Sequence, residues 1–155
     1  MKAPGRPPRL PLVFQKYDPP VYFVTICCAK RRPLLANDEV HSSFREFALR
    51  AQQSDVAVGR YILMPDHIHV FVSGSAEFRL EQWVRMLKTV LGKTLCDLGH
   101  KPPLWQRGFF DHLVRSSESY AEKWEYVREN PVRGGWAGRS EDWPYQGEIV
   151  VIDRV

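Results

Sequence analysis

The sequence has few cysteines, no long apolar run and no internal repeat, and each of these absences excludes a class of protein. Its 155 residues contain three cysteines, Cys27, Cys28 and Cys96, and no Cys-x-x-Cys pair. An odd number of cysteines without metal-binding spacing argues against a disulfide scaffold and against a cysteine-based zinc site. Such cysteine usage is typical of a reducing compartment, so we expect a cytoplasmic protein.

No hydrophobic stretch approaches the ~20 residues that cross a membrane. The N-terminal residues are basic and lead into no long apolar segment, so we expect neither a secretory signal nor a membrane partner. Hydrophobic residues make up 44% of the chain, which is enough to fill the core of one domain. The formal net charge is +4 and the isoelectric point is about 9.1, which is compatible with a polyanionic partner but does not require one.

Composition divides the chain into three segments. Residues 1–20 are basic and rich in proline, and we interpret them as an extended arm or, equally, as a disordered tail. We expect residues 21–136 to form the folded domain. Residues 137–155 are expected to be a tail that is irregular or forms a short edge strand.

Hydrophobic periodicity predicts four strands and three helices in the folded domain. The strands are expected at residues 21–28, 56–64, 67–73 and 109–115, and the helices at about 38–53, 79–98 and 119–130. The second and third strands form a hairpin around Pro65-Asp66, and a capping box at residues 119–122 opens the last helix, which Pro131 ends. This order predicts an α+β fold, a ferredoxin-like split βαβ antiparallel sheet with helices on one face and an added C-terminal helix.

Two histidines stand one residue apart at the start of an alternating β-branched run, the MPDHIHVFV segment at residues 64–72. Successive strand side chains point to opposite faces, so His67 and His69 share one face, separated by two rises of roughly 3.3 Å. Ile68, Val70 and Val72 share the other face. A strand that buries one face and offers two imidazoles on the other is suited to half of a metal site.

The last predicted helix carries a tyrosine outside its buried face. Tyr120, Trp124 and Val127 follow the i, i+4, i+7 spacing of a buried stripe, whereas Tyr126 points well away from it. Asn130 lies four residues on and shares a face with Tyr126 at the last turn. The phenol is then a candidate nucleophile, and the Asn130 oxygen is a candidate third ligand beside two histidines. A divalent ion with such donors and open positions suits phosphoryl chemistry.

Each of these residues also has an ordinary structural interpretation. Two histidines on a strand are more often surface or hydrogen-bonded side chains, a helical tyrosine commonly packs, and asparagine before proline commonly ends a helix. A small zinc hydrolase using His67, His69 and Asp66 is a further alternative. Asp66, if extended, points to the opposite side and is better suited to capping the turn.

Four segments resemble those of a known family. They are YFVT at residues 22–25, MPDHIH at 64–69, LWQRGFFDHLVR at 104–115 and YVRENPVRGG at 126–135. In order and spacing they resemble the REP-associated tyrosine transposases, a single-tyrosine branch of the HUH (His-hydrophobic-His) endonucleases. The second and fourth segments together carry most of the specificity. Gly134-Gly135-Trp136 differs from the Ala-Gly-Leu that family members often carry.

The resemblance implies a metal-dependent endonuclease and strand transferase acting on single-stranded DNA near palindromic hairpins. His67, His69 and Asn130 would bind Mg²⁺ or Mn²⁺, and Tyr126 would form a 5′-phosphotyrosine link and free a 3′-hydroxyl. Rejoining needs no ATP because the covalent intermediate keeps the bond energy. Relatives include monomers and homodimers, and the sequence favours neither state. The alternative function is a non-catalytic DNA-binding regulator of palindromic repeats.

Basic and aromatic side chains suit such a substrate, because cations pair with phosphates and rings stack on unpaired bases. The candidates are Arg31, Arg32, Lys88, Lys93, Arg107, Arg115 and Arg133, with Trp105 as a stacking platform. Each charge is equally explained as a solvated surface group, and Trp105 as a core ring. His112 is interpreted as a structural or DNA-facing side chain rather than a ligand.

Overall fold

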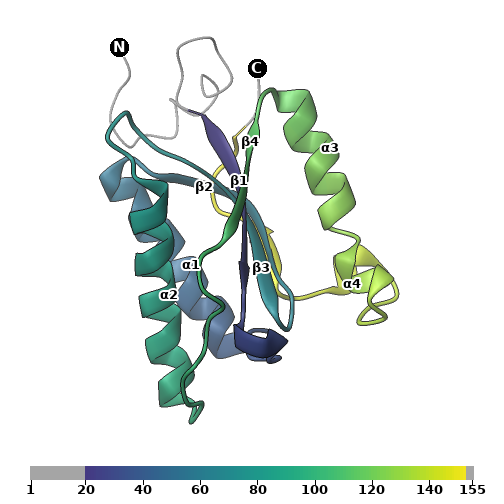
Figure 1. The fold of residues 1–155 in the computed structure, drawn as a ribbon. Helices are drawn as coiled ribbons and strands as arrows, with labels where there is room; N and C mark the ends of the chain where they lie inside the picture. Colours follow the sequence, from purple (N-terminus) through teal and green to yellow (C-terminus); the bar gives the residue numbers. More distant parts are fainter. Residues whose placement is uncertain (1–19, 153–155) are drawn as a thin grey trace.

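The computed structural model describes residues 20–152, so the expected arm at residues 1–19 lies outside the described part. A five-stranded antiparallel sheet in the order β4-β1-β3-β2-β5 forms the centre of the molecule (Figure 1). Its strands are β1 (Val21–Cys27), β2 (Ala57–Leu63), β3 (His67–Ser73), β4 (Phe110–Val114) and β5 (Gln146–Glu148). This arrangement confirms the predicted α+β class.

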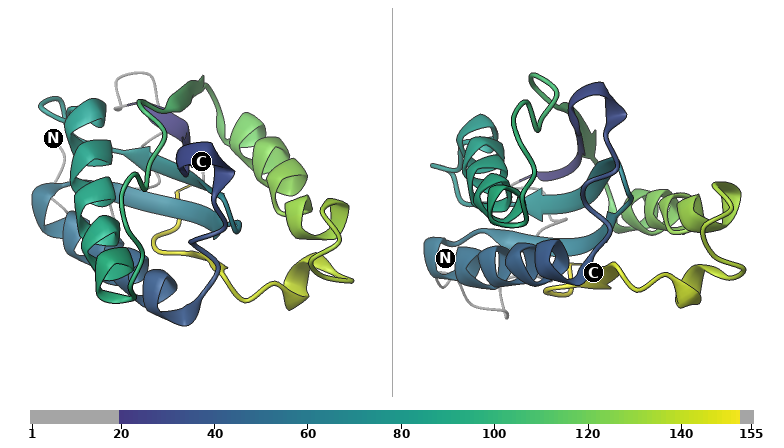
Figure 2. Two further views of the ribbon diagram at one scale, coloured as in Figure 1. Left: turned by 60° about the horizontal axis from the view of Figure 1, so that its bottom comes forward. Right: turned by 90° about the horizontal axis from the view of Figure 1, so that it is seen from below.

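Helices cover both faces of the sheet. The long helices α1 (Asp38–Ala51) and α2 (Leu80–Asp97) lie side by side on one face, and α3 (Ser117–Val127) lies on the other, followed by the short α4 (Asn130–Arg133) (Figures 1 and 2). Three short 3-10 turns complete the structure, at Ala29–Arg31, Gln52–Ser54 and Ser140–Asp142. None of the helices in the described part of the chain is long and apolar enough to cross a membrane.

Strand alternation creates two hydrophobic cores, one on each side of the sheet. Ile68, Val70 and Val72 are fully buried beneath α1 and α2, as the apolar periodicity predicts. Phe71 faces the opposite side and packs against Tyr120 of α3, with ring centroids 4.3 Å apart. The added helix therefore docks over the face that carries His67 and His69.

The segment after α4 packs into the second core. β5 pairs antiparallel with β2 at the edge of the sheet, which matches the expected short edge strand. Trp143 and Ile152 are buried beside Phe71, and the Trp143 indole N–H donates a 3.0 Å hydrogen bond to the Leu63 carbonyl. The described part of this segment thus supports the face that carries the histidines.

The prediction of one helix over residues 119–130 is wrong at both ends. The chain leaves β4 in an extended conformation at Ser116, whose hydroxyl accepts from the Ser119 N–H, so α3 begins at Ser117 without the predicted capping box. It ends at Val127, and Asn130 opens the separate helix α4. Pro131 lies in the first turn of α4, where its missing N–H costs no hydrogen bond, so it starts a helix instead of ending one.

Candidate functional site

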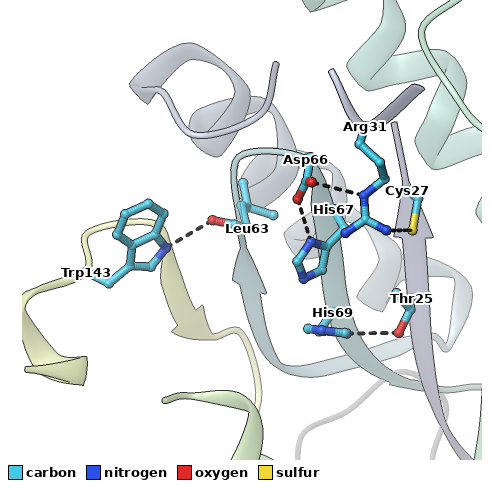
Figure 3. Close-up of polar contacts among 8 residues, drawn as sticks. All are labelled: Thr25, Cys27, Arg31, Leu63, Asp66, His67, His69 and Trp143. Carbon is cyan, nitrogen blue, oxygen red and sulfur yellow. Dashed lines mark hydrogen bonds and ion pairs between the residues drawn. The ribbon is translucent and has the colours of Figure 1, made fainter. Parts of the chain in front are cut away.

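His67 and His69 lie next to each other on the face of β3 that α3 covers, at the end of the strand near the Pro65-Asp66 turn. Their ring centroids are 4.7 Å apart and the rings are nearly perpendicular, at 75° (Figure 3). The register of the sheet places Cys27 opposite His67 and Thr25 opposite His69. The strand period therefore brings the two imidazoles together, and β1 supplies their neighbours.

Asp66 determines the tautomer of His67. Its Oδ1 lies 2.8 Å from His67 Nδ1, and its Oδ2 accepts a 2.9 Å bond from Arg31 Nε (Figure 3). Burial acts to raise the pKa of Asp66, but the bonds from Arg31 and His67 outweigh it and hold that pKa below its ordinary value. The ionised carboxylate only accepts, so the proton of a neutral His67 lies on Nδ1 and its Nε2 lone pair is available to a metal.

Thr25 holds the second imidazole from the neighbouring strand. Its Oγ1 lies 2.9 Å from His69 Nδ1, and the Phe23 ring stacks on His69 with centroids 5.1 Å apart. Burial, followed by the charges of His67, Lys123 and Arg31, lowers the pKa of His69 to about 3. His69 is therefore neutral at physiological pH, the state in which an imidazole coordinates a metal.

Arg31 reaches this site because the chain turns sharply after β1. Lys30 and Arg31 both adopt left-handed backbone angles, with φ of 52° and 53°, in the 3-10 turn that follows Cys28. The Arg31 guanidinium then contacts Asp66 and also lies 3.6 Å from Cys27 Sγ. Its side chain remains 56% exposed, so it both orients Asp66 and presents positive charge to solvent.

A cavity of about 490 Å³ adjoins His67. It is lined by Arg31, Pro33, Met64, Pro65, Asp66, His67, Asn130, Gly134 and Trp136. The structure thus brings His67 and Asn130 to one cavity. His69 does not line it, but its ring contacts that of His67. Two imidazole nitrogens and one carboxamide oxygen would be suitable donors to a divalent ion and would leave open positions on it.

The described residues offer no alternative metal site built from His, Cys, Asp and Glu side chains alone. Residues 20–152 contain no group of three or more His, Cys, Asp and Glu side chains arranged to hold a metal ion. Both Asp66 oxygens are engaged, one with His67 and one with Arg31. This carboxylate is therefore placed to orient His67 in the second shell rather than to complete a zinc site.

Tyr126 projects from α3 and leaves its hydroxyl accessible. Tyr120, Trp124 and Val127 are buried, as the helical stripe predicts, whereas Tyr126 is 65% exposed. It is absent from the residues that line the cavity.

Arg133 connects Tyr126 to Asn130. The Arg133 guanidinium carbon lies 4.1 Å from the Tyr126 ring centroid, and Nη2 donates to the Tyr126 carbonyl at 2.8 Å and to Asn130 Oδ1. Tyr126 and Asn130 are therefore linked through Arg133 of α4, and they do not lie on one continuous helix.

Three of the expected DNA contacts brace the loop at residues 101–108. The Arg32 guanidinium donates to two carbonyl oxygens of this loop, at 2.8 and 2.6 Å, and Lys88 Nζ donates to two more, at 3.0 and 2.8 Å. The half-buried Trp105 packs against the main core, and its indole N–H bonds to the Lys88 carbonyl at 3.1 Å. These contacts give all three side chains a structural role.

The remaining expected contacts are divided between the two faces. Lys93 pairs with Asp97 on α2, across the sheet from the histidines. Arg107 and Arg115 are exposed, and neither lines the cavity. Of the predicted cations, Arg133 contacts Asn130 and Tyr126, and Arg31 contacts Asp66, the hydrogen-bond partner of His67.

Sequence reasoning missed the positions of three residues at this site. Thr25 was part of a recognised segment, but its role follows from the β1–β3 register, which no local pattern reveals. For Asp66 the sequence predicts a turn-capping role, because an extended strand would point its side chain away from the histidines. Trp136 was noted only as a departure in the sequence, yet it lines the same cavity as Asn130.

The fold and the site together define a class: a split βαβ domain with paired histidines on a central strand and a tyrosine-bearing helix on the same face. The family described as "Transposase IS200 like" matches residues 20–130, which is most of the chain. The chain belongs to this family.

Named relatives narrow the similarity to one branch. The chain is 23% identical over 128 residues to the REP-associated tyrosine transposase of Escherichia coli (strain K12), covering 80% of this chain and 73% of the relative. A protein of Haemophilus influenzae Rd, provisionally given the same name, is 27% identical over 141 residues and covers 81% of this chain and 77% of its own. Both support a tyrosine transposase, as the sequence motifs indicated.

A solved structure shares the fold. The structure of the REP-associated tyrosine transposase bound to a REP hairpin superposes with a TM-score of 0.65 at 20% identity, covering 82% of this chain and 75% of that one. At this identity the comparison establishes the architecture and not the residues of the site.

Proposed function

We propose that this protein is a metal-dependent single-strand DNA endonuclease and strand transferase that cleaves near palindromic hairpins. The observation that supports it best is that Asp66 and Thr25 each contact one imidazole at Nδ1. With Nδ1 engaged in this way, Nε2 of each ring is the nitrogen that would coordinate a metal; for His69 this holds in the tautomer in which Thr25 accepts from His69. Surface histidines without a function do not require a hydrogen-bond partner at Nδ1 of each ring, whereas histidines that bind a metal commonly have one.

His67, His69 and Asn130 would hold Mg²⁺ or Mn²⁺. Bound there, the ion would supply charge to the non-bridging oxygens of a scissile phosphate and align it for displacement. The neutral state of His69 and the Nδ1–H tautomer of His67 suit both rings for this role at physiological pH. The Arg31 guanidinium would add a second positive group at the wall of the same cavity.

Tyr126 would be the nucleophile. Its oxygen would attack phosphorus, the bond from phosphorus to the 3′ oxygen would break, and a 5′-phosphotyrosine link and a free 3′-hydroxyl would result. The phenol loses its proton to solvent and the departing oxygen gains one, so the step balances without a co-reactant. Attack by a different 3′-hydroxyl reverses it and joins a new strand. Exposure of Tyr126 is consistent with a macromolecular substrate.

Single-stranded DNA attached to a hairpin is the substrate class that the comparisons favour. The solved neighbour is described as bound to a REP hairpin. The basic composition of the chain and the two arginines at the site suit a phosphate backbone.

The test uses hairpin oligonucleotides from repeats in the source genome, labelled on either side of the hairpin, with Mn²⁺ and the full chain. We expect a protein–DNA adduct on the 5′-phosphate side that Tyr126→Phe and His67→Ala abolish, while hairpin binding by Tyr126→Phe persists. Tyr22→Phe is the matched control, because Tyr22 packs near Phe78 on the other face of the sheet and should form the adduct normally.

Two results would contradict the proposal. An adduct that survives in Tyr126→Phe would remove this tyrosine from the reaction. Metal-independent hairpin binding without cleavage of any strand would instead favour the alternative of a non-catalytic DNA-binding regulator.

A further inference from the structure

Trp136 is a large aromatic side chain that the fold leaves on the surface beside the candidate site. It is 57% exposed, whereas Trp83, Trp124 and Trp143 are 5–7% exposed and Trp105 is half-buried. Exposing an indole forfeits the free energy that burial would give, so its position calls for an explanation. Trp136 lines the same cavity as His67 and Asn130.

The loop that carries Trp136 is built around its ring. A Cβ at Gly134 would lie only 2.8 Å from Trp136 Cδ1, so a side chain there would displace the indole. Gly135 has φ of +79°, a conformation that favours glycine. The backbone N–H of Trp136 donates a 2.7 Å hydrogen bond to the Pro131 carbonyl, and the centroids of the Trp136 and Trp143 rings are 6.4 Å apart. The backbone bond fixes the main chain at Trp136, and glycine at position 134 leaves room for the indole.

The surroundings of the ring include basic side chains as well as the apolar Pro33, Met64 and Pro65 of the cavity. Its exposed neighbours along the chain are glycines and the arginines at positions 133 and 139. Arg31 lies on the wall of the same cavity. A protein interface would need a contiguous apolar patch around the indole. One exposed aromatic ring in a cavity that also carries Arg31 instead suits the stacking of an unpaired base while a cation contacts its phosphate.

We infer that Trp136 is a stacking platform for an unpaired nucleobase of single-stranded DNA next to the scissile phosphate. The inference rests on the proposed function, since it assigns the substrate's position at that site. It replaces Trp105 as the stacking residue, because the Trp105 indole is packed against the core and bonded to Lys88. It also gives a role to the exposed Trp136 and to the two glycines that precede it.

Binding measurements on the full chain carrying Tyr126→Phe test the inference without cleavage. The probes are a DNA hairpin with single-stranded flanks, the same hairpin with blunt ends, and a series of flanked hairpins with one abasic nucleotide each. We expect Trp136→Ala to bind the flanked hairpin roughly 5- to 100-fold more weakly, the range of base–aromatic stacking, and Trp136→Phe to retain most of the affinity. Blunt hairpin binding should change little.

The abasic series identifies a stacking contact. At one flank position, removing the base should weaken binding by the protein that retains Trp136 as much as the Trp136→Ala substitution weakens binding to the intact probe. On that abasic probe the two proteins should bind with equal affinity. Met86→Ala is the matched control, because Met86 is 51% exposed on α2, across the sheet, and should bind normally. Quenching of tryptophan fluorescence by the flanked hairpin should disappear in Trp136→Phe.

Two outcomes would overturn the inference alone. Trp136→Ala could bind every probe like the parent protein, or its loss could be the same at all abasic positions; neither is compatible with stacking on one base. In both cases the Tyr126-dependent adduct would still form in the cleavage assay, so the proposed function would stand. Absence of that adduct, with no preference for single-stranded flanks, would overturn both proposals.

Discussion

The Arg133 guanidinium lies 4.1 Å from the Tyr126 ring centroid and hydrogen-bonds through one nitrogen to the carbonyl of the same tyrosine. That nitrogen also contacts Asn130 Oδ1. A single side chain of α4 thus joins the candidate nucleophile of α3 to the candidate ligand that opens α4. The carboxamide oxygen that would coordinate a metal is the atom that Arg133 binds.

Arg133→Gln should therefore tighten Mn²⁺ binding. The guanidinium competes with the ion for Asn130 Oδ1 and repels it, and an exposed contact of this kind is worth up to about 1 kcal/mol, or roughly two- to fivefold in affinity. Titration of free Mn²⁺ followed by electron paramagnetic resonance measures the change. Arg128→Gln removes the same charge from a side chain that pairs with Glu125, and should leave the affinity nearly unchanged. Weaker Mn²⁺ binding by Arg133→Gln would show that Arg133 supports the ligand instead of competing for it.

Asp66→Asn should weaken Mn²⁺ binding about 10- to 100-fold, the usual cost of removing a second-shell carboxylate from a ligating histidine. The carboxamide lacks the charge that holds the proton on His67 Nδ1 and that pairs with Arg31. The same resonance titration gives the affinity. Asp97→Asn is matched in chemistry but lies on α2, where Asp97 pairs with Lys93. Equal effects of the two substitutions would argue for general electrostatics rather than orientation of His67.

Thr25→Val should reduce both Mn²⁺ affinity and the rate of adduct formation, by about tenfold. Valine keeps the shape of the β-branched side chain but cannot contact His69 Nδ1, so the imidazole is free to rotate or change tautomer. Thr25→Ser restores the hydroxyl and should recover most of the loss. Failure of serine to rescue would mean that packing, not the hydrogen bond, sets the position of His69.

Trp143→Ala and Trp136→Ala should differ sharply in stability, although both remove an indole from the same region. Trp143 is 7% exposed and bonds to the Leu63 carbonyl, so its truncation should lower the free energy of unfolding by about 3–5 kcal/mol. Trp136 is 57% exposed, and its truncation should change that free energy by no more than about 0.5 kcal/mol. Urea unfolding measures both. A large loss in Trp136→Ala would assign this ring to the core.

Cys96 should be the one cysteine that iodoacetamide modifies rapidly in the folded protein at pH 8. It is exposed, whereas Cys27 and Cys28 are buried, and burial raises the pKa of the Cys28 thiol from 9.0 to about 11. The thiolate is the reactive form, so a raised pKa slows the reaction of Cys28 further. The same raised pKa makes the folded state less stable relative to the unfolded state as the pH rises from 9 towards 11. Intact-mass analysis counts the modified thiols, and all three should react in guanidinium chloride. Rapid modification of Cys28 in the native state would contradict its burial.

The interior of each strand and helix follows from local pattern. The third strand, His67–Ser73, has the predicted bounds. Both the first and the last residue of α2 lie within a residue or two of the predicted limits, because a long apolar stripe specifies a helix strongly. The boundaries of α3 do not follow, because two serines offer competing caps and a proline suits both a helix end and a helix start. Such choices depend on how the chain leaves β4 and packs α4.

The candidate site divides in the same way. The period of a strand alone determines that His67 and His69 share a face, and the period of a helix determines that Tyr126 lies off the buried stripe of Tyr120 and Trp124. The placement of Thr25 and Asp66 on the two imidazoles depends on strand register and turn geometry.

The sequence by itself therefore determined the α+β class, the paired histidines and the family motifs, since these depend on residues close together in the chain. Only the tertiary structure decided that Asn130 reaches the cavity of His67 from a second helix, that Arg133 joins it to Tyr126, and that Trp136 instead of Trp105 presents an open ring. The physical reason is that each of these relationships joins segments whose separation is set by packing on the sheet. Local periodicity carries no information about such distances.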